Sequence, residues 1–183
     1  MKHYFKKMRG NGLRSSPRKP LSEIIWSWLG SFAGIYAIWL LNSHLGIQED
    51  ANLFLIGSFG ATAVLVYGAP MGELSQPRNL VGGHVISAIA GIVAYKLLPE
   101  HAALAAALGV SVAIAAMLLT DTLHPPGGAT ALIAVIGGKS IHDLGFMYVF
   151  SPVLAGVLIM LAVALIVNNL SSNTARHYPK HWF

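Results

Sequence analysis

Apolar stretches of membrane-spanning length alternate with short polar links along this chain. A helix rises about 1.5 Å per residue, so roughly 20 apolar residues cross the hydrocarbon core of a bilayer. Four stretches approach or exceed this length: Ile24–Leu41, Leu80–Leu98, Ala102–Thr120 and Leu144–Val167. The pattern predicts four long transmembrane helices, the last of them kinked by its internal Pro152.

Two further apolar elements are short and interrupted. Asn52–Gly68 contains three glycines, and Ala129–Ile136 follows the run His124-Pro125-Pro126-Gly127-Gly128. Each proline pushes the preceding residue out of the α region, so we expect a structural break at Pro125 and Pro126 that leads into a half-helix. Non-helical backbone at membrane depth is tolerated only where it is buried in protein or lines a wet cavity. Asp121–Gly138 is therefore the first candidate for the functional site.

The two short elements share a sequence. Gly60-Ala61-Thr62-Ala63 recurs 68 residues later as Gly128-Ala129-Thr130-Ala131, and at this offset Leu80–Leu98 overlies Leu144–Val167. Transporters are often built from such repeats, with interrupted helices at the site. We therefore predict an all-α integral membrane bundle of two related three-element repeats, about 21–99 and 100–168. In this bundle the short elements meet at the bilayer centre.

The short elements are either broken helices that cross the membrane or re-entrant helices that return to the side they came from. Crossing gives six passages and inverted halves, whereas re-entry gives four passages and parallel halves. The distribution of Lys and Arg fits both arrangements. The uncharged length of Ala51–Gly72 slightly favours crossing.

Composition places the whole chain in one membrane domain. It is 55% hydrophobic and only 10% charged, with a mean hydropathy of +0.61, well outside the soluble range of about 25% charged residues. The chain contains no cysteine, which excludes disulfides and thiolate metal sites. It also contains no phosphate-binding Gly-x-x-x-x-Gly-Lys motif, so energy from ATP is not expected.

Basic residues gather at both ends of the chain. Residues 1–20 hold seven of the Lys and Arg residues and no acid, and 169–183 form a second short basic tail. Both tails are predicted to be cytoplasmic and the protein to be a multi-pass protein of the cell or inner membrane, with no cleaved signal. We expect the basic charge to face lipid rather than nucleic acid, because no aromatic-rich folded surface accompanies it.

Ionisable side chains beside the short elements are candidates for the pathway of an anion. Arg78, followed by Asn79, can fork onto two oxygens or simply obey the positive-inside rule. His124 can bind an anion and carry a proton, or cap the preceding helix 102–120. His84 is a weaker candidate near the start of its span. Asp121 pairs with His124 or Arg78, or ends a helix; no third metal ligand is evident, so no metal or other cofactor is expected.

Small polar groups in the repeated segment complete the candidate site. Thr62 and Thr130 occupy equivalent repeat positions, where a hydroxyl either lines a path or bonds back to a helical carbonyl. Gly127 and Gly128 are expected to expose backbone N–H groups to an anion at the start of the half-helix.

Three blocks of this sequence resemble one known family. His124-Pro125-Pro126-Gly127-Gly128-Ala129-Thr130-Ala131-Leu132 is similar to the signature of the HPP family of small integral membrane proteins. Gln76-Pro77-Arg78-Asn79 with Gly82-Gly83-His84 resembles the second family block, and Gly60-Ala61-Thr62-Ala63 the first. The resemblance implies four transmembrane helices and a transport role, with nitrite uptake in plastid and cyanobacterial members. Some members carry a C-terminal regulatory domain of the CBS type, which we do not expect here.

The leading hypothesis is a channel or secondary transporter for a small inorganic anion, nitrite by the family resemblance. Its partners would be the anion, the lipid bilayer and, for a body this small, further copies of itself. A membrane-embedded enzyme that uses His124 and Asp121 as acid and base is the second hypothesis. No nucleophile with a positioned partner supports it, so we expect no enzyme activity. A non-transporting accessory subunit is the third.

Overall fold

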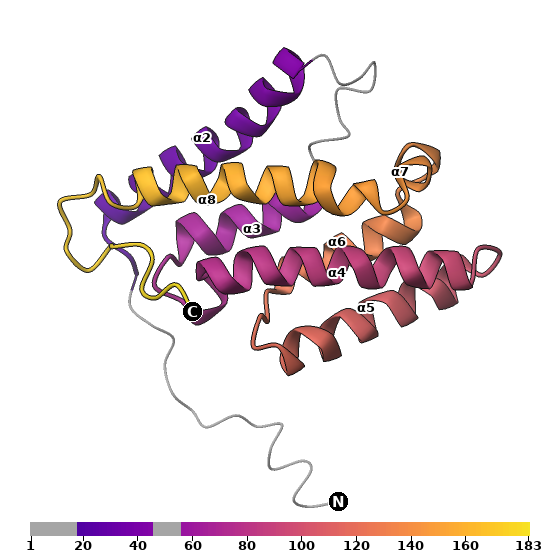
Figure 1. Ribbon diagram of the computed structural model, residues 1–183. Coiled ribbons are helices and arrows are strands. Elements are labelled where there is room, and N and C mark those ends of the chain that lie inside the picture. Colours follow the sequence, from indigo (N-terminus) through magenta and orange to yellow (C-terminus); the bar gives the residue numbers. More distant parts are fainter. Residues whose placement is uncertain (1–17, 46–55) are drawn as a thin grey trace, which may run out of the picture.

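The computed structural model describes residues 18–45 and 56–183, which form a helical bundle without strands (Figure 1). The elements follow one another as α2 (Leu21–Leu45), α3 (Gly57–Gly68), η1 (Glu73–Ser75), α4 (Pro77–Leu97), α5 (Ala102–Leu119), α6 (Pro125–Ile136), α7 (Lys139–Leu144), η2 (Val149–Leu154) and α8 (Ala155–Val167). Residues 1–17 of the expected basic tail and residues 46–55 lie outside the described residues.

Four helices are long and apolar enough to cross a membrane: α2, α4, α5 and the continuous segment Val149–Val167. The prediction of four long helices is therefore confirmed. The last span begins at Val149 rather than Leu144, because Gly145 has a positive φ of 52° and separates α7 from it. Its kink lies where expected, since Ser151, next to Pro152, has non-helical backbone angles of −139° and 117°.

The two short helices, α3 and α6, have 12 residues each. At about 1.5 Å per residue each extends about 18 Å, well short of the roughly 30 Å hydrocarbon core. Neither helix is long enough to cross a bilayer by itself. This length weakens the argument for crossing that the uncharged stretch Ala51–Gly72 gave. Residues 51–55 of that stretch lie outside the described residues.

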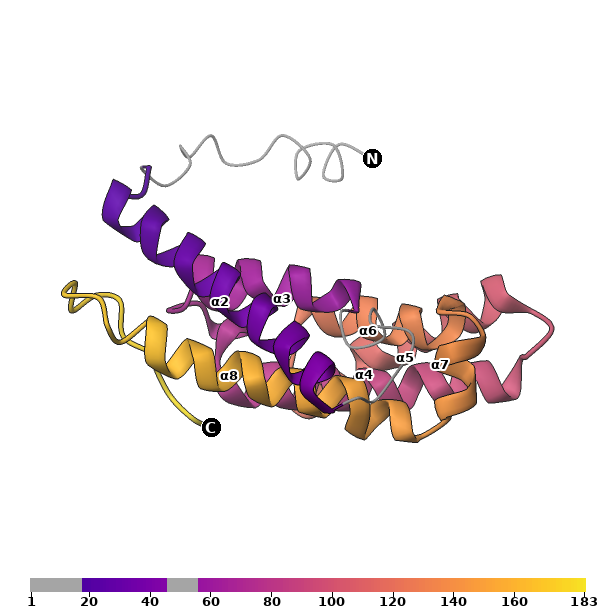
Figure 2. The same ribbon diagram turned by 90° about the horizontal axis from the view of Figure 1, so that it is seen from above.

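The chain nevertheless reverses direction from each of the six main helices to the next, in the order α2, α3, α4, α5, α6 and α8 (Figures 1 and 2). We call the end of the bundle where α2 and α4 begin and α8 finishes the tail end. From this end α2, α4 and α6 run toward the far end, whereas α3, α5 and α8 run back toward it. The short helices thus lie antiparallel to each other and in contact, α3 packing also on α2 and α8 and α6 packing also on α4 and α5. This path is the one that broken crossing helices would take.

The break before α6 is shorter than expected. Pro125 and Pro126 are the first two residues of α6, and the non-helical backbone is confined to Thr120–His124. The expectation that these prolines form the extended break is wrong, because the first turn of a helix has no partners for the N–H groups that proline lacks. Within the break Asp121 has a positive φ of 52°, and His124 is extended at φ −141° and ψ 105°.

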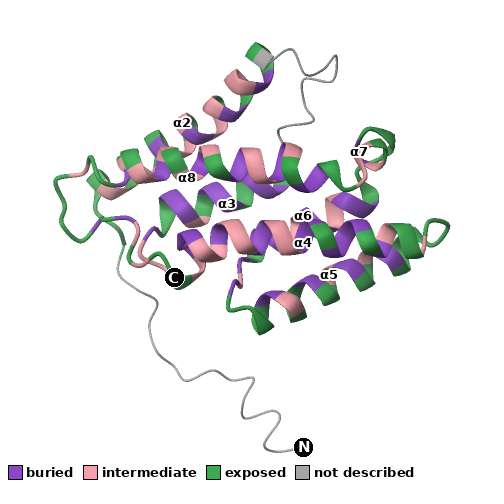
Figure 3. Ribbon diagram, in the orientation of Figure 1, coloured by how far each residue is buried: buried purple, intermediate pink, exposed green. Residues whose placement is uncertain are grey.

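Small residues bring the inner helices into close contact. A Cβ atom added to Gly91 of α4 would lie 2.4 Å from the carbonyl oxygen of Ala131 in α6, and one added to Gly156 of α8 would lie 2.3 Å from the Phe59 ring. The buried residues gather on α3, α4 and α6, whereas α2 and α5 expose large apolar side chains on their outer faces (Figure 3). The outer faces suit lipid, and the inner contact leaves almost no room.

We predict that Gly91→Ala destabilises the protein by about 1–3 kcal/mol, because the backbone of α6 cannot yield to the added methyl group. Gly60→Ala is the matched control, since no atom lies within 4 Å of the added Cβ there. Unfolding of both variants in detergent micelles measures the effect. Equal stability of the two variants would contradict the packing described for α4 and α6.

Candidate functional site

One histidine ring is held between the two short helices. His84 of α4 has its Nε2 atom 2.7 Å from the hydroxyl of Thr62 in α3, and its Nδ1 atom 2.7 Å from the hydroxyl of Thr130 in α6. All three side chains are fully buried. The two threonines at equivalent positions of the predicted repeat therefore bind opposite nitrogens of one imidazole.

A second histidine extends this contact toward the tail end. The Nε2 atom of His124 lies 3.2 Å from the Thr62 hydroxyl, and its Nδ1 atom lies 2.7 Å from the backbone carbonyl of Leu74. The His124 ring is also fully buried, with its centroid 5.0 Å from that of His84. Thr130, His84, Thr62 and His124 thus form one continuous hydrogen-bonded chain, which we call the histidine chain.

Hydrogen atoms can be placed along this chain in a consistent order with both rings neutral. Because a carbonyl accepts only, Nδ1 of His124 carries hydrogen and donates to Leu74, and Nε2 accepts from Thr62. Nε2 of His84 then donates to Thr62, and Nδ1 of His84 accepts from Thr130. Every ring nitrogen has a partner in this order, as buried polar atoms require.

Close backbone packing at the break positions His124. A Cβ atom on Gly83 of α4 would lie 2.5 Å from Cβ of His124, so only glycine lets the break approach α4 this closely. Gly127 meets α4 in the same way, with the Ser87 hydroxyl 2.6 Å from its added Cβ. The N–H of Gly127 donates to the His124 carbonyl at 2.8 Å. The structure gives Gly127 a packing role instead of the exposed anion-binding N–H expected from the sequence.

Several other sequence candidates lie away from the histidine chain. Gly128 is half-buried and faces α5, where its nearest neighbour is Val110. Asp121 does not pair with His124, because its side chain is 83% exposed and lies 3.5 Å from Arg78. The expected cap of His124 on helix 102–120 is also absent, since its ring binds Leu74.

Arg78 and Asn79 hold the backbone of the break. An Nη atom of Arg78 donates to the carbonyl of Thr120 at 2.7 Å, and the amide of Asn79 donates to the carbonyl of Leu123 at 3.0 Å. Both residues start α4, so these bonds fix the break to the tail end of that helix. The geometry assigns them to the support of His124 rather than to direct contact with it.

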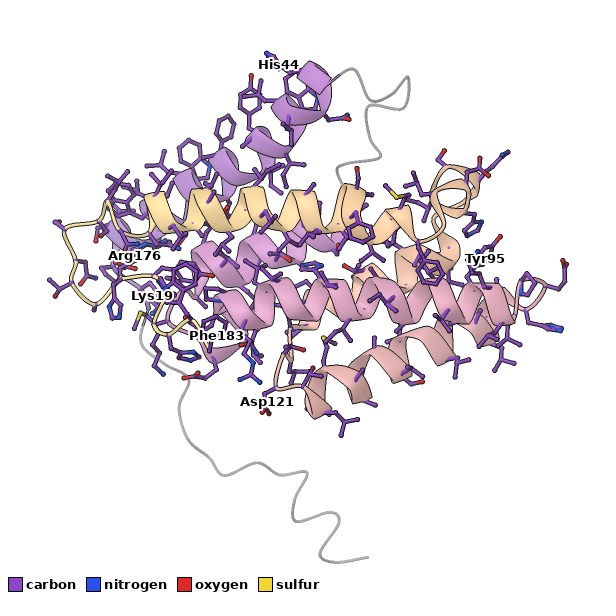
Figure 4. The ribbon with its side chains drawn as sticks, in the orientation of Figure 1. Lys19, His44, Tyr95, Asp121, Arg176 and Phe183 are labelled. Atoms are coloured by element: carbon purple, nitrogen blue, oxygen red, sulfur yellow. The ribbon has the colours of Figure 1, made fainter. Side chains whose placement is uncertain are left out.

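A pocket of about 310 Å³ opens beside this support at the tail end. Its polar lining consists of Glu73, Arg78, Asn79, Asp121 and His181. Two of its lining residues, Leu123 and Glu73, directly precede His124 and Leu74 in the chain. Figure 4 shows Asp121 and Phe183, which also lines the pocket, at this end of the bundle. The pocket therefore reaches the backbone next to the end of the histidine chain.

The C-terminal segment packs on the tail end, which sequence reasoning missed. The Tyr178 hydroxyl donates to the carbonyl of Ser75 at 2.8 Å, and burial raises the pKa of this phenol. The side-chain oxygen of Gln76 accepts the backbone N–H of Lys180 at 2.8 Å. Gln76 belongs to the second family block, so its polarity inside an apolar chain was an available signal.

Arg176 connects this segment to three helices. It is 2% exposed and donates to Glu23 of α2 at 2.8 Å, to the Tyr67 carbonyl of α3 at 2.7 Å and to Asn168 after α8 at 3.0 Å. Figure 4 shows it beside Lys19 at the tail end. The sequence indicated only a short basic tail here, and Glu23 at the edge of the first span was an available signal for a partner of Arg176.

Within the described residues, no three His, Asp or Glu side chains lie close enough to hold a metal ion. The histidine chain contains two imidazoles and two hydroxyls and no carboxylate. Its chemistry is that of hydrogen bonding and proton exchange.

The match to a family model agrees with this architecture. The model of the HPP transmembrane region matches residues 16–179, and the chain belongs to this family of multi-pass membrane proteins. Two transmembrane proteins of Dictyostelium discoideum are 48% and 45% identical to it over 98% of its length. The chain spans 57% and 63% of these relatives. No solved structure matches it.

We predict that docking of the C-terminal segment weakens in acid. Hydrogen bonds from Lys180 and His181 hold the pKa of Glu73 below its ordinary value of 4.5. This contribution is therefore fully present above the ordinary carboxyl pKa and is lost as pH falls through the lowered one. Hydrogen exchange of the 176–183 amides across this range measures it.

Glu73→Gln should remove the pH dependence of the protection of these amides against exchange. Asp143→Asn is the matched control, because Asp143 pairs with Lys139 in α7, at the far end of the bundle. Unchanged pH dependence in the Glu73 variant would show that another group holds the segment.

Proposed function

We propose that this protein is a channel or secondary transporter for a small inorganic anion, and that the histidine chain is its functional centre. The carrying observation is the burial of two imidazoles and two hydroxyls where the two short helices meet. Polar groups at membrane depth are costly and are retained mainly where they serve a pathway. The family resemblance makes nitrite the first anion to test.

The position of the chain supports a path from the tail end. His84 lies seven residues after the start of α4, which places it about 10 Å from that end of the helix. The polar pocket lined by Leu123 and Glu73 opens at the same end of the bundle. An anion that enters the pocket would meet imidazole N–H and hydroxyl donors once the contacts around Leu74 open. The site thus lies nearer the tail end than the expected bilayer centre.

The repeat prediction gains support from the same site. Thr62 and Thr130 extend from antiparallel short helices to one ring, as two inverted halves would place them. Transporters with inverted halves commonly form their site from such interrupted elements. We also propose that the tail end faces the cytoplasm, because the Lys and Arg residues of both termini gather in the adjoining segments.

The enzyme hypothesis receives less support from the geometry. Its acid and base, Asp121 and His124, have separate partners, Arg78 and Leu74. A general acid and base must both reach one substrate, and an exposed carboxylate beside a buried ring does not suit that role. A membrane transport site needs donors along a path, and the hydroxyls and rings of the histidine chain would supply the donors.

Anion flux into proteoliposomes that contain only this polypeptide tests the proposal. We expect nitrite to enter faster than into protein-free liposomes, and nitrate and chloride serve as comparison anions. No flux of any of the three above the protein-free rate would contradict the transport proposal.

We predict that Thr130→Val lowers this flux about tenfold or more. Valine keeps the shape but leaves Nδ1 of His84 without its hydrogen-bond partner, a loss worth about 1–3 kcal/mol. Ser111→Ala is the control, because the Ser111 side chain is exposed and its hydroxyl donates to the Leu108 carbonyl of its own helix, α5, at 3.0 Å. Equal flux in the two variants, at equal protein level, would place the pathway elsewhere.

A further inference from the structure

We propose that the histidine chain holds one exchangeable proton and that the anion therefore crosses together with a proton. This inference rests on the proposed transport function and names its coupling ion. It is carried by the alternative acceptors that the structure places around the two threonines. Each hydroxyl has a backbone carbonyl within reach as a second acceptor besides a ring nitrogen, so the chain can store a proton without moving its rings.

The first alternative acceptor belongs to Thr62. Its hydroxyl lies 3.1 Å from the carbonyl of Ser58, as well as beside both rings. In the neutral chain this hydroxyl donates to Nε2 of His124. When Nε2 of His124 gains a proton, the hydroxyl hydrogen turns to Ser58, and the oxygen accepts an N–H from each ring. Two lone pairs suffice for two acceptances, so every hydrogen bond is kept.

The second alternative acceptor belongs to Thr130. Its hydroxyl lies 3.4 Å from the carbonyl of Pro126 and 2.7 Å from Nδ1 of His84. If the added proton resides on His84, Nδ1 donates to Thr130 and the Thr130 hydrogen turns to Pro126. The proton therefore has two residences, one on each ring. In each of them a threonine turns its hydrogen to the carbonyl four residues earlier.

No described carboxylate or ammonium contacts the two rings, so the proton is not fixed by a salt bridge. Phe59 of α3 lies against His84, with centroids 5.8 Å apart, and α5 contributes the neutral Met117 beside Gly83. Ahead of η2, Tyr148 donates to the Thr130 carbonyl at 3.1 Å. The pocket at the tail end holds the charged Glu73, Arg78 and Asp121 and the titratable His181.

Proton and charge balance define the cycle. One proton from water in the pocket converts the neutral chain to its singly protonated form, which attracts one anion. Release of the anion together with that proton at the far end restores the neutral chain. One anion and one proton move in the same direction, and no net charge crosses the membrane. A weak acid in its ionised form is the substrate class that fits this exchange.

Nitrite uptake and internal acidification, measured together in proteoliposomes that contain a pH dye, test the inference. We expect about one proton to enter per nitrite above the protein-free background, and a potential set by valinomycin and potassium to leave the rate unchanged. Nitrite uptake without proton uptake would overturn the inference while the transport function stands. Absence of any anion uptake would overturn both.

Thr62 provides the matched pair of variants. Thr62→Ser keeps the switching hydroxyl and should keep the proton-to-nitrite ratio, whereas Thr62→Val removes the hydroxyl and should reduce that ratio at least severalfold. A Thr62→Val protein that still carries protons in step with nitrite would contradict the proposal.

A readout without transport covers the case in which the valine variant fails to fold. In a variant that keeps only His84 and His124 as histidines, ring nitrogen resonances in liposomes can be followed from about pH 8 to about pH 4. We expect both rings to shift together at one midpoint as they share one proton. Rings that titrate independently, or that stay neutral throughout, would overturn the inference.

Discussion

The need to provide partners for two buried imidazole rings controls this structure. Lipid offers no hydrogen bonds, so the ring nitrogens of His84 and His124 require protein partners. Thr62, Thr130 and the Leu74 carbonyl supply them, and each comes from a different element. These elements must therefore meet at one place in the interior of the bundle. Gly83 and Gly91 then make the approach of α6 to α4 sterically possible.

Side chains at the tail end of the bundle likewise provide hydrogen-bond partners, here for backbone carbonyls of the break and of the turn before α4. Arg78 and Asn79 occupy the carbonyls that the break leaves without helical partners, and Gln76 and Tyr178 join the C-terminal segment to the turn before α4. Arg176 completes the join through Glu23. Arg78 and Asn79 also line the polar pocket, so the contacts that support His124 border that pocket. A change in these contacts at the tail end should therefore affect His124 through the backbone of Glu73 and Leu74.

The four long helices could be predicted from uncharged apolar stretches, because the length of a stretch and its absence of charge are local properties of the sequence. Thr62, His84, His124 and Thr130 were candidates for similar reasons, as polar residues in apolar or broken segments. Their mutual contact could not be predicted, since it depends on the packing of three helices through glycine. The buried role of Arg176 could not be predicted, because two of its partners, Glu23 and Tyr67, lie more than 100 residues away from it in the chain. Pro125 was assigned to the break because proline signals both a break and a helix start.

The central claim is that the histidine chain meets the transported anion. Ring nitrogen resonances of all eight histidines, recorded in liposomes while nitrite is added, test it most directly. We predict a saturable shift of His84 and His124, with the rings in α2 and α7 unchanged. A shift confined to His181 in the pocket, or no shift of the two buried rings at saturating nitrite, would contradict this account.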